Sequence, residues 1–121
     1  MAFEADVATV LKTVCPRVYP DVAPEPLPVR PFVVYQQVGG ETINPLTVET
    51  VAEIPDLRHA RMQIVVWGNS RLSASATARL IENAMRIATQ FKAEPVGAMV
   101  SDYDATVKLY GVRQDFSVFF R

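Results

Sequence analysis

The sequence is poor in the residues that most often hold metals or act as nucleophiles. It contains one cysteine, Cys15, and one histidine, His59, so no internal disulfide can form and no Cys or His pair stands at a metal-binding spacing. Only five glycines are present, and neither a glycine-rich phosphate loop nor a Gly-x-Ser-x-Gly motif occurs. We therefore expect no catalytic residue, no metal site and no cofactor. Cys15 is interpreted as a small apolar residue close to the end of a helix.

An excess of one charge and long apolar runs are also missing. The 12 Lys and Arg residues nearly balance the 13 Asp and Glu residues, for a net charge of -1. Proteins that bind nucleic acids normally carry a basic excess, so DNA or RNA is not expected as the principal ligand. No signal peptide or membrane span is recognisable, because the apolar runs are only a few residues long. We expect a protein that stays in the cytoplasm or joins something assembled there, with no membrane partner.

Apolar residues, by contrast, are abundant enough to build a core. Half of the 121 residues are hydrophobic, and this length predicts a single domain over residues 1–121. The predicted elements are a helix over 3–14, a proline-rich connector over 16–31, a strand over 32–38, a long loop over 40–60, a strand over 61–68, a helix over 72–91 and C-terminal strands over 96–121.

The spacing of apolar and proline residues supports these elements. Six of the nine prolines fall in 16–31, which excludes a helix or an inner strand there. Alternation of apolar and polar residues predicts half-buried strands, with Trp67 at the more apolar end of the outward side of 61–68. The second helix has a predicted buried stripe made of Ala76, Leu80, Ala84, Ile87, Ala88 and Phe91, widened by Ile81.

These elements predict an α+β fold. The late strands follow one another through connections too short for parallel crossovers, so they should pair antiparallel. We expect a mostly antiparallel sheet of about four main strands, with a long helix packed on one face and a short N-terminal helix.

Few side chains suggest chemistry, whereas several suggest a protein partner. His59 lies among charges but has no nucleophile in view, and Asp102 and Asp104 are typical turn residues. Trp67 and the aromatic residues of 116–120 exceed what one helix on one sheet face can cover. Surplus apolar surface of this kind is typical of protein interfaces.

The order of several segments resembles the tail-terminator, or tail-completion, proteins of long-tailed bacteriophages, whose genes are often carried in prophages. The segments are residues 31–38 after the proline-rich stretch, the strand with its arginine, glutamine and tryptophan over 58–67, the helix over 73–87 and the closing strand over 110–120. The resemblance implies a structural protein that forms a ring, commonly a hexamer, on the head-proximal end of the tail tube. Such a ring stops tube polymerisation and offers a surface to the head.

The implied partners are further copies of the chain, the tail tube protein, and a head connector or head completion protein. The implied location is the head-proximal end of the virion tail, after assembly in the host bacterial cytoplasm. The candidate interface residues are Glu49, Glu53, Trp67, Arg79, Arg86, Arg113, Asp115 and Phe119. We expect the acidic 40–60 loop to meet Arg79 or Arg86 of a neighbour, the outer sheet edge to pair between subunits, and another chain to cover the Trp67 end.

Two alternatives stay open at this point. The chain could be another head–tail joining or minor tail protein. More remotely, it could be a small enzyme or ligand-binding domain, with a pocket between helix and sheet and His59 or Asp102 at its mouth.

Overall fold

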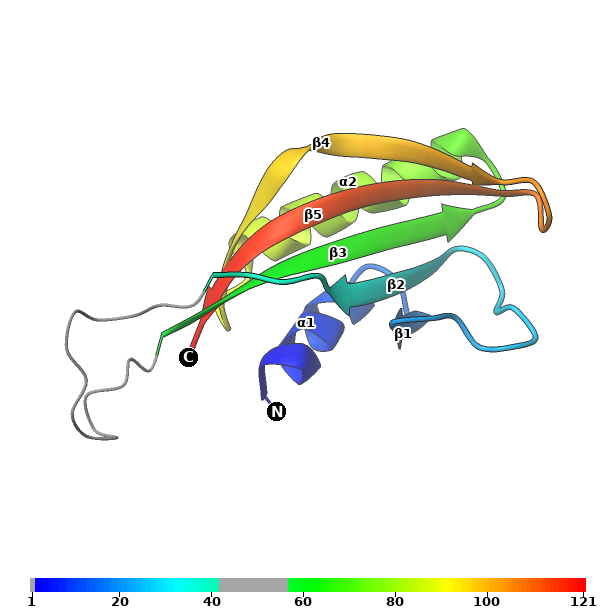
Figure 1. Ribbon diagram of the computed structural model, residues 1–121. Coiled ribbons are helices and arrows are strands. Elements are labelled where there is room, and N and C mark those ends of the chain that lie inside the picture. Colours follow the sequence, from blue (N-terminus) through cyan, green and yellow to red (C-terminus); the bar gives the residue numbers. More distant parts are fainter. Residues whose placement is uncertain (1, 42–56) are drawn as a thin grey trace.

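A computed structural model describes residues 2–41 and 57–121. Its elements follow the order α1 (Ala2–Lys12), β1 (Val18–Pro20), β2 (Phe32–Gln37), β3 (Arg58–Gly68), α2 (Arg71–Ile87), β4 (Lys92–Asp104) and β5 (Leu109–Phe120) (Figure 1). Glu49 and Glu53, two of the candidate interface residues, lie outside the described residues.

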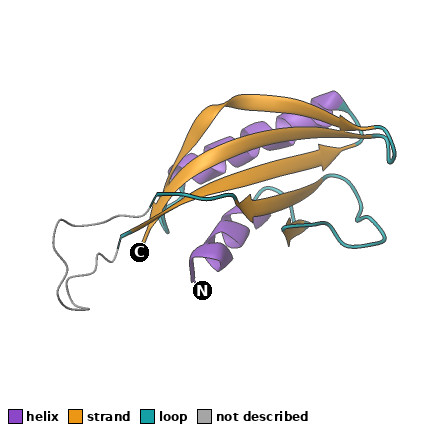
Figure 2. Ribbon diagram, viewed as in Figure 1, coloured by secondary structure: helices purple, strands orange, loops and turns teal. Residues whose placement is uncertain are grey.

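The strands form one five-stranded sheet, and both helices lie on the same side of it (Figure 2). The spatial order is β1-β2-β3-β5-β4. β1 runs parallel to β2, and every other neighbouring pair is antiparallel. The α+β class and the mostly antiparallel pairing are therefore confirmed, while the expected sheet of about four main strands has a fifth, which is parallel to its neighbour.

The fifth strand was missed because it lies inside the proline-rich connector. Val18–Pro20 pairs with β2, and the Val33 N–H donates to the Arg17 carbonyl at 2.9 Å. Pro20 is tolerated because β1 is an edge strand, where one side of the backbone needs no partner. The residues between β1 and β2 carry the chain back to the start of β2, which makes the pairing parallel.

Several predicted boundaries also move. The first helix ends at Lys12, two residues before the predicted end, and β3 begins at Arg58, so it takes three residues from the predicted loop. β4 begins at Lys92 and contains Pro95, whereas strands were expected only from residue 96. Pro95 fits there because β4 pairs only with β5 and its other edge is free of a strand in the described chain.

Alternation along β3 and β5 divides the sheet into two faces. Met62 pairs with Phe116 and Val66 with Val112, and all four side chains are buried under the helices. We call this the helix face and the opposite side the open face. α1 closes the helix face through Phe3, whose ring stacks on Phe120 at a centroid distance of 3.7 Å and meets Phe91 edge-on at 6.2 Å.

A side-chain cap begins α2, and a change of backbone conformation ends it. The Ser70 hydroxyl accepts a hydrogen bond from the Ser73 N–H at 3.1 Å, which caps the first turn. The helix ends at Ile87 rather than at the predicted residue 91, because Ala88 is already extended, with ψ of 139°. This exit lets Phe91 turn back into the core.

The predicted buried stripe of α2 is correct for Ile81 and Phe91 and wrong for Ala76, Leu80 and Ile87. The residues that face the sheet are Ala74, Ala78, Ile81 and Met85, whereas Leu80 and Ile87 are exposed. The three exposed residues of the predicted stripe lie on the opposite side of the helix from the buried ones, and both sets have helical spacing. On the buried side the small side chains of Ala74 and Ala78 let the helix approach the strands closely.

Candidate interaction surfaces

The open face contains a hollow at its Trp67 end. Its volume is about 360 Å³, and β2, β3, the connector and the β4–β5 hairpin all contribute to it. The apolar members of its lining include Leu27, Phe32, Val34, Val65, Trp67, Val107 and Leu109. The chain's own connector and hairpin thus partly enclose the end of the sheet that carries Trp67.

Trp67 occupies its place because the residue opposite has no side chain. Trp67 pairs with Gly111 across β3 and β5. A Cβ atom added to Gly111 would lie 2.8 Å from the nearest atom of the indole ring. The Trp67 ring therefore lies against the Gly111 backbone and forms part of the wall of the hollow.

The rim of the hollow is acidic. Asp21, Glu25 and Asp104 line it, and all three are exposed. No Lys, Arg or His is among its lining residues within the described ranges 2–41 and 57–121. An apolar cavity with a carboxylate rim favours an apolar group that carries positive charge beside it.

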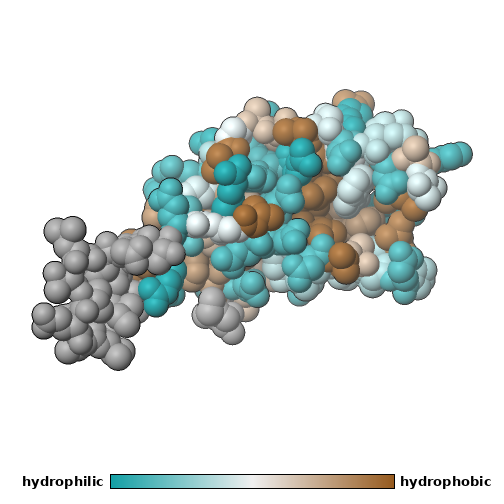
Figure 3. Space-filling model, viewed as in Figure 1, coloured by the Kyte–Doolittle hydropathy of each residue, from teal (hydrophilic) through white to brown (hydrophobic). Residues whose placement is uncertain are grey.

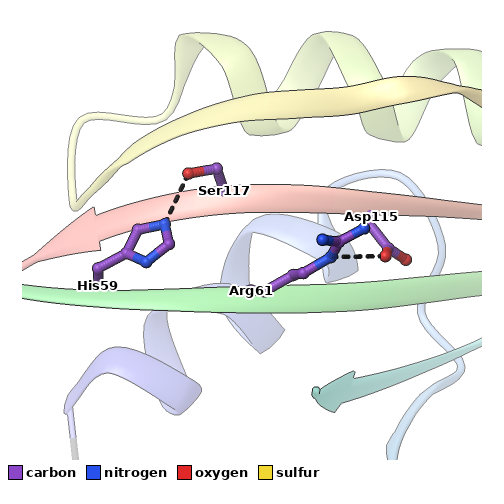
Figure 4. A network of polar contacts seen from close by, with 4 residues as sticks. All are labelled: His59, Arg61, Asp115 and Ser117. Atoms are coloured by element: carbon purple, nitrogen blue, oxygen red, sulfur yellow. Dashed lines mark hydrogen bonds and ion pairs between the residues drawn. The ribbon is translucent and has the colours of Figure 1, made fainter. Parts of the chain in front are cut away.

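The middle of the open face is polar. The Arg61 Nε donates to the Asp115 Oδ2 at 2.8 Å, and the two residues project side by side from β3 and β5 (Figure 4). An ion pair of this exposure contributes roughly 0–1 kcal/mol to stability. The predicted interface residue Asp115 thus already has a partner within its own chain.

Arg113, another predicted interface residue, lines a second hollow of about 290 Å³ together with Val96, Val100 and Asp115. This hollow lies where the pairing of β4 with β5 is interrupted between Val96 and Val100. On the helix face, the buried Gln114 amide donates to the Glu82 carboxylate at 2.9 Å and to the Gly97 carbonyl at 3.2 Å. The interruption is therefore held to α2 by hydrogen bonds.

The far end of the open face carries His59. Its Nδ1 accepts the Glu41 backbone N–H at 2.9 Å, so its Nε2 carries the proton and donates to the Ser117 Oγ at 2.7 Å (Figure 4). The ring also lies 4.6 Å from that of Phe119, which is 41% exposed. A histidine that donates to a serine hydroxyl is not placed to accept a proton from it, so this arrangement is structural rather than nucleophilic.

The remote enzyme alternative finds little support in this geometry. His59 pairs with Phe119 and Asp102 with Gly111, so the two candidates stand at opposite ends of β5. Neither lines either of the two hollows. The Asp102 Oδ1 accepts the Tyr103 N–H at 2.9 Å, a local backbone contact of the kind expected near a turn. Within the described residues no cluster of three or more His, Cys, Asp or Glu side chains could hold a metal.

The outer side of α2 is a further surface, and its apolar character was missed because Leu80 and Ile87 had been assigned to the core. Leu72, Leu80 and Ile87 are 84%, 57% and 79% exposed. Arg79 and Arg86, both predicted interface residues, are exposed beside them. We call Leu72, Leu80 and Ile87 the α2 outer row, which the two arginines flank. On the other side of the molecule, apolar side chains are interspersed with polar ones, and several gather toward the end with the β4–β5 hairpin (Figure 3).

Comparison with known protein families decides the affiliation. The model of the family named tail completion protein gp17 matches residues 2–121. The chain belongs to this family. The resemblance noted in the sequence is thereby confirmed, and membership supports a structural role in phage tail morphogenesis, in the virion, with other tail or head proteins as partners.

A comparison with curated proteins found none that matches this chain.

No helix within residues 2–41 and 57–121 has the length and apolar character needed to cross a membrane.

Proposed function

We propose that this tail completion protein forms a ring on the head-proximal end of the tail tube, where it stops tube polymerisation and presents a surface for head joining. The observation that carries the proposal is the pair of unlike apolar surfaces on opposite sides of the sheet layer. One is the α2 outer row, and the other is the hollow at Trp67.

Unlike surfaces favour a ring over a two-fold dimer. A closed ring of identical subunits needs two different, complementary patches on each copy, one for each neighbour. A two-fold dimer needs only one self-complementary patch. The two surfaces of this chain differ in shape and in charge, as the two patches of a ring subunit must.

Pairing of sheet edges between subunits is less favoured than docking of faces. The outer edge strand β4 contains Pro95, which cannot donate a backbone hydrogen bond, and it is interrupted between Val96 and Val100. Natural proteins use such features to prevent strands from adding to an edge. If the subunits of a ring dock through these faces, one end of the ring remains for the tube and the other for the head.

Removal of the gene from the phage tests this function. We expect overlong tails of variable length without heads, seen by negative-stain electron microscopy, and restoration of both features when the gene is supplied in trans. Normal tail lengths with full infectivity would overturn the proposal. Tails of normal length that merely lack heads would instead assign the chain to another head–tail joining role.

A further inference from the structure

We infer that the α2 outer row of one copy docks into the Trp67 hollow of the next copy. This inference rests on the proposed ring and names the contact between its subunits. It gives Arg79 and Arg86 an acidic partner surface within the described residues, whereas most of the 40–60 loop expected to meet them lies outside those residues.

The three apolar residues of the outer row lie on one side of α2. At 100° per residue, Leu72, Leu80 and Ile87 fall within about 80° of one another. Arg79 and Arg86 flank that row on its same side. The buried residues Ala74, Ala78, Ile81 and Met85 lie on the opposite side, so the row is directed away from the sheet.

The exposed charge of this side of the helix is positive. Glu82, the acidic residue between the two arginines in sequence, is only partly exposed and accepts a hydrogen bond from the Gln114 amide at 2.9 Å. Arg79 and Arg86 therefore stand beside the apolar row without a carboxylate of α2 directed to the same side.

The hollow has the complementary properties. Val34, Val65 and Trp67 supply apolar lining, and its volume of about 360 Å³ is within the range of pockets that enclose small molecules or inserted side chains. Asp21 and Glu25 on the rim place negative charge where the flanking arginines of a docked row would lie.

Charge also decides between the possible pairings of two copies. Two outer rows facing each other would bring arginines together, and two hollows facing each other would bring carboxylates together, both of which are unfavourable. Only the row-to-hollow pairing brings opposite charges into contact. Because the row and the hollow lie on opposite sides of the sheet, one copy can use both at once, as a ring requires.

The test uses two variants of the full chain, each altered on one surface. The row variant carries Leu80→Asp and Ile87→Asp, which present carboxylates to the acidic rim. The hollow variant carries Val22→Lys and Glu25→Lys, at two exposed lining positions. The control introduces one charge of each sign, through Thr9→Asp and Val29→Lys, at exposed positions that do not line the hollow. All changed positions are exposed, and circular dichroism and thermal unfolding check that each variant folds.

Assembly is measured by native mass spectrometry and negative-stain microscopy, with and without purified tail tubes. We expect the parent and the control to form rings, and each variant alone to need at least about tenfold more protein to do so. A mixture of the two variants should give at least a one-to-one pair, because the intact row of one fits the intact hollow of the other.

Trp67 provides a second readout, because it is the only tryptophan of the chain. Its emission should shift to shorter wavelength when the pair forms, since the docked row removes water from the hollow. Rings formed by either variant as readily as by the parent, or a mixture that stays monomeric, would overturn the inference while leaving the ring itself standing. A parent chain that forms no annular species even on tubes would overturn the proposed function and the inference together.

Discussion

At the scale of single residues, the contact between Trp67 and Gly111 shapes the hollow. The indole ring lies in space that any side chain at position 111 would enter. This contact joins β3 to β5 on the open face and depends on a residue 44 positions away along the chain, as the register of the two strands requires.

Gly111→Ala should therefore displace the Trp67 ring. We expect a loss of about 1–3 kcal/mol in the free energy of unfolding, because an added methyl group in a filled space forces side chains from their preferred positions. Tryptophan emission should shift to longer wavelength, and urea unfolding gives the stability. The control Ser101→Ala, at an exposed position of β4, should change neither quantity. An unshifted emission in Gly111→Ala would contradict the contact.

Tyr35 makes the stability depend on alkaline pH. Burial raises the pKa of its phenol above the ordinary value of 10.0, and the nearby carboxylates of Glu4 and Asp21 raise it further by repelling the phenolate. The folded state thus favours the protonated phenol more than the unfolded state does. This contribution to stability is fully present below pH 10.0 and is lost as the pH rises through the raised folded value.

Tyr35→Phe should remove this part of the pH dependence. We expect the melting temperature of the variant to fall less steeply than that of the parent once the pH exceeds about 10. Every other titrating group is common to both proteins, so the difference between the two curves isolates Tyr35. Melting curves that stay parallel through the alkaline range would contradict the assignment.

At the scale of elements, α2 is amphipathic in an unusual way, with apolar residues on both of its sides. The inner stripe is packed against β3, β4 and β5, and the outer row is exposed. A helix that retains an exposed apolar row on an otherwise polar side is typical of a surface that another protein covers.

Two isoleucines of α2 test which stripe is buried. Ile81→Ala should lower the free energy of unfolding by about 2–4 kcal/mol, because it leaves a cavity in the core. Ile87→Ala removes the same atoms from an exposed site, so its effect should stay within about 0.5 kcal/mol. Urea unfolding of the isolated chain measures both. Similar losses in the two variants would mean that the orientation of α2 described above is wrong.

At the scale of the whole molecule, the sheet should be most stable at its centre. β3 and β5 are paired on both sides, whereas β1 and β4 are each paired on one side among the described residues. The central strands also carry most of the buried residues under the helices. Local opening therefore costs least at the two edges.

Hydrogen exchange followed by mass spectrometry should reveal this order in the isolated chain. We expect the slowest exchange in peptides covering residues 62–66 and 112–118. Exchange should be faster by orders of magnitude around residues 96–100, where the pairing of β4 is interrupted. Equal protection of β4 and β5 would contradict the order. If rings form as proposed, protection on the outer side of α2 should increase upon assembly.

Particular residues show which features of the fold the sequence predicted and which it did not. The alternation of apolar and polar residues predicted a half-buried strand over 61–68, where the structure buries Met62, Ile64 and Val66. The proline cluster correctly excluded a helix from the connector. The same prolines hid the parallel strand Val18–Pro20, because edge pairing leaves no periodic signal in three residues. Of the candidate interface residues, Asp115 proved to be paired with Arg61, a contact between strands that no local pattern reveals.

The sequence by itself determined the class of the fold, the approximate course of most elements and the family resemblance. These follow from the spacing of apolar residues and from the order of the segments along the chain, both of which can be recognised without knowing any contact between distant residues. Only the tertiary structure decided which side of α2 is buried, that the connector and the β4–β5 hairpin both line the hollow at Trp67, and that acidic and basic surfaces stand on opposite sides of the sheet. Those outcomes depend on what distant segments offer to one another, because an apolar stripe becomes core or surface only through the partner packed against it.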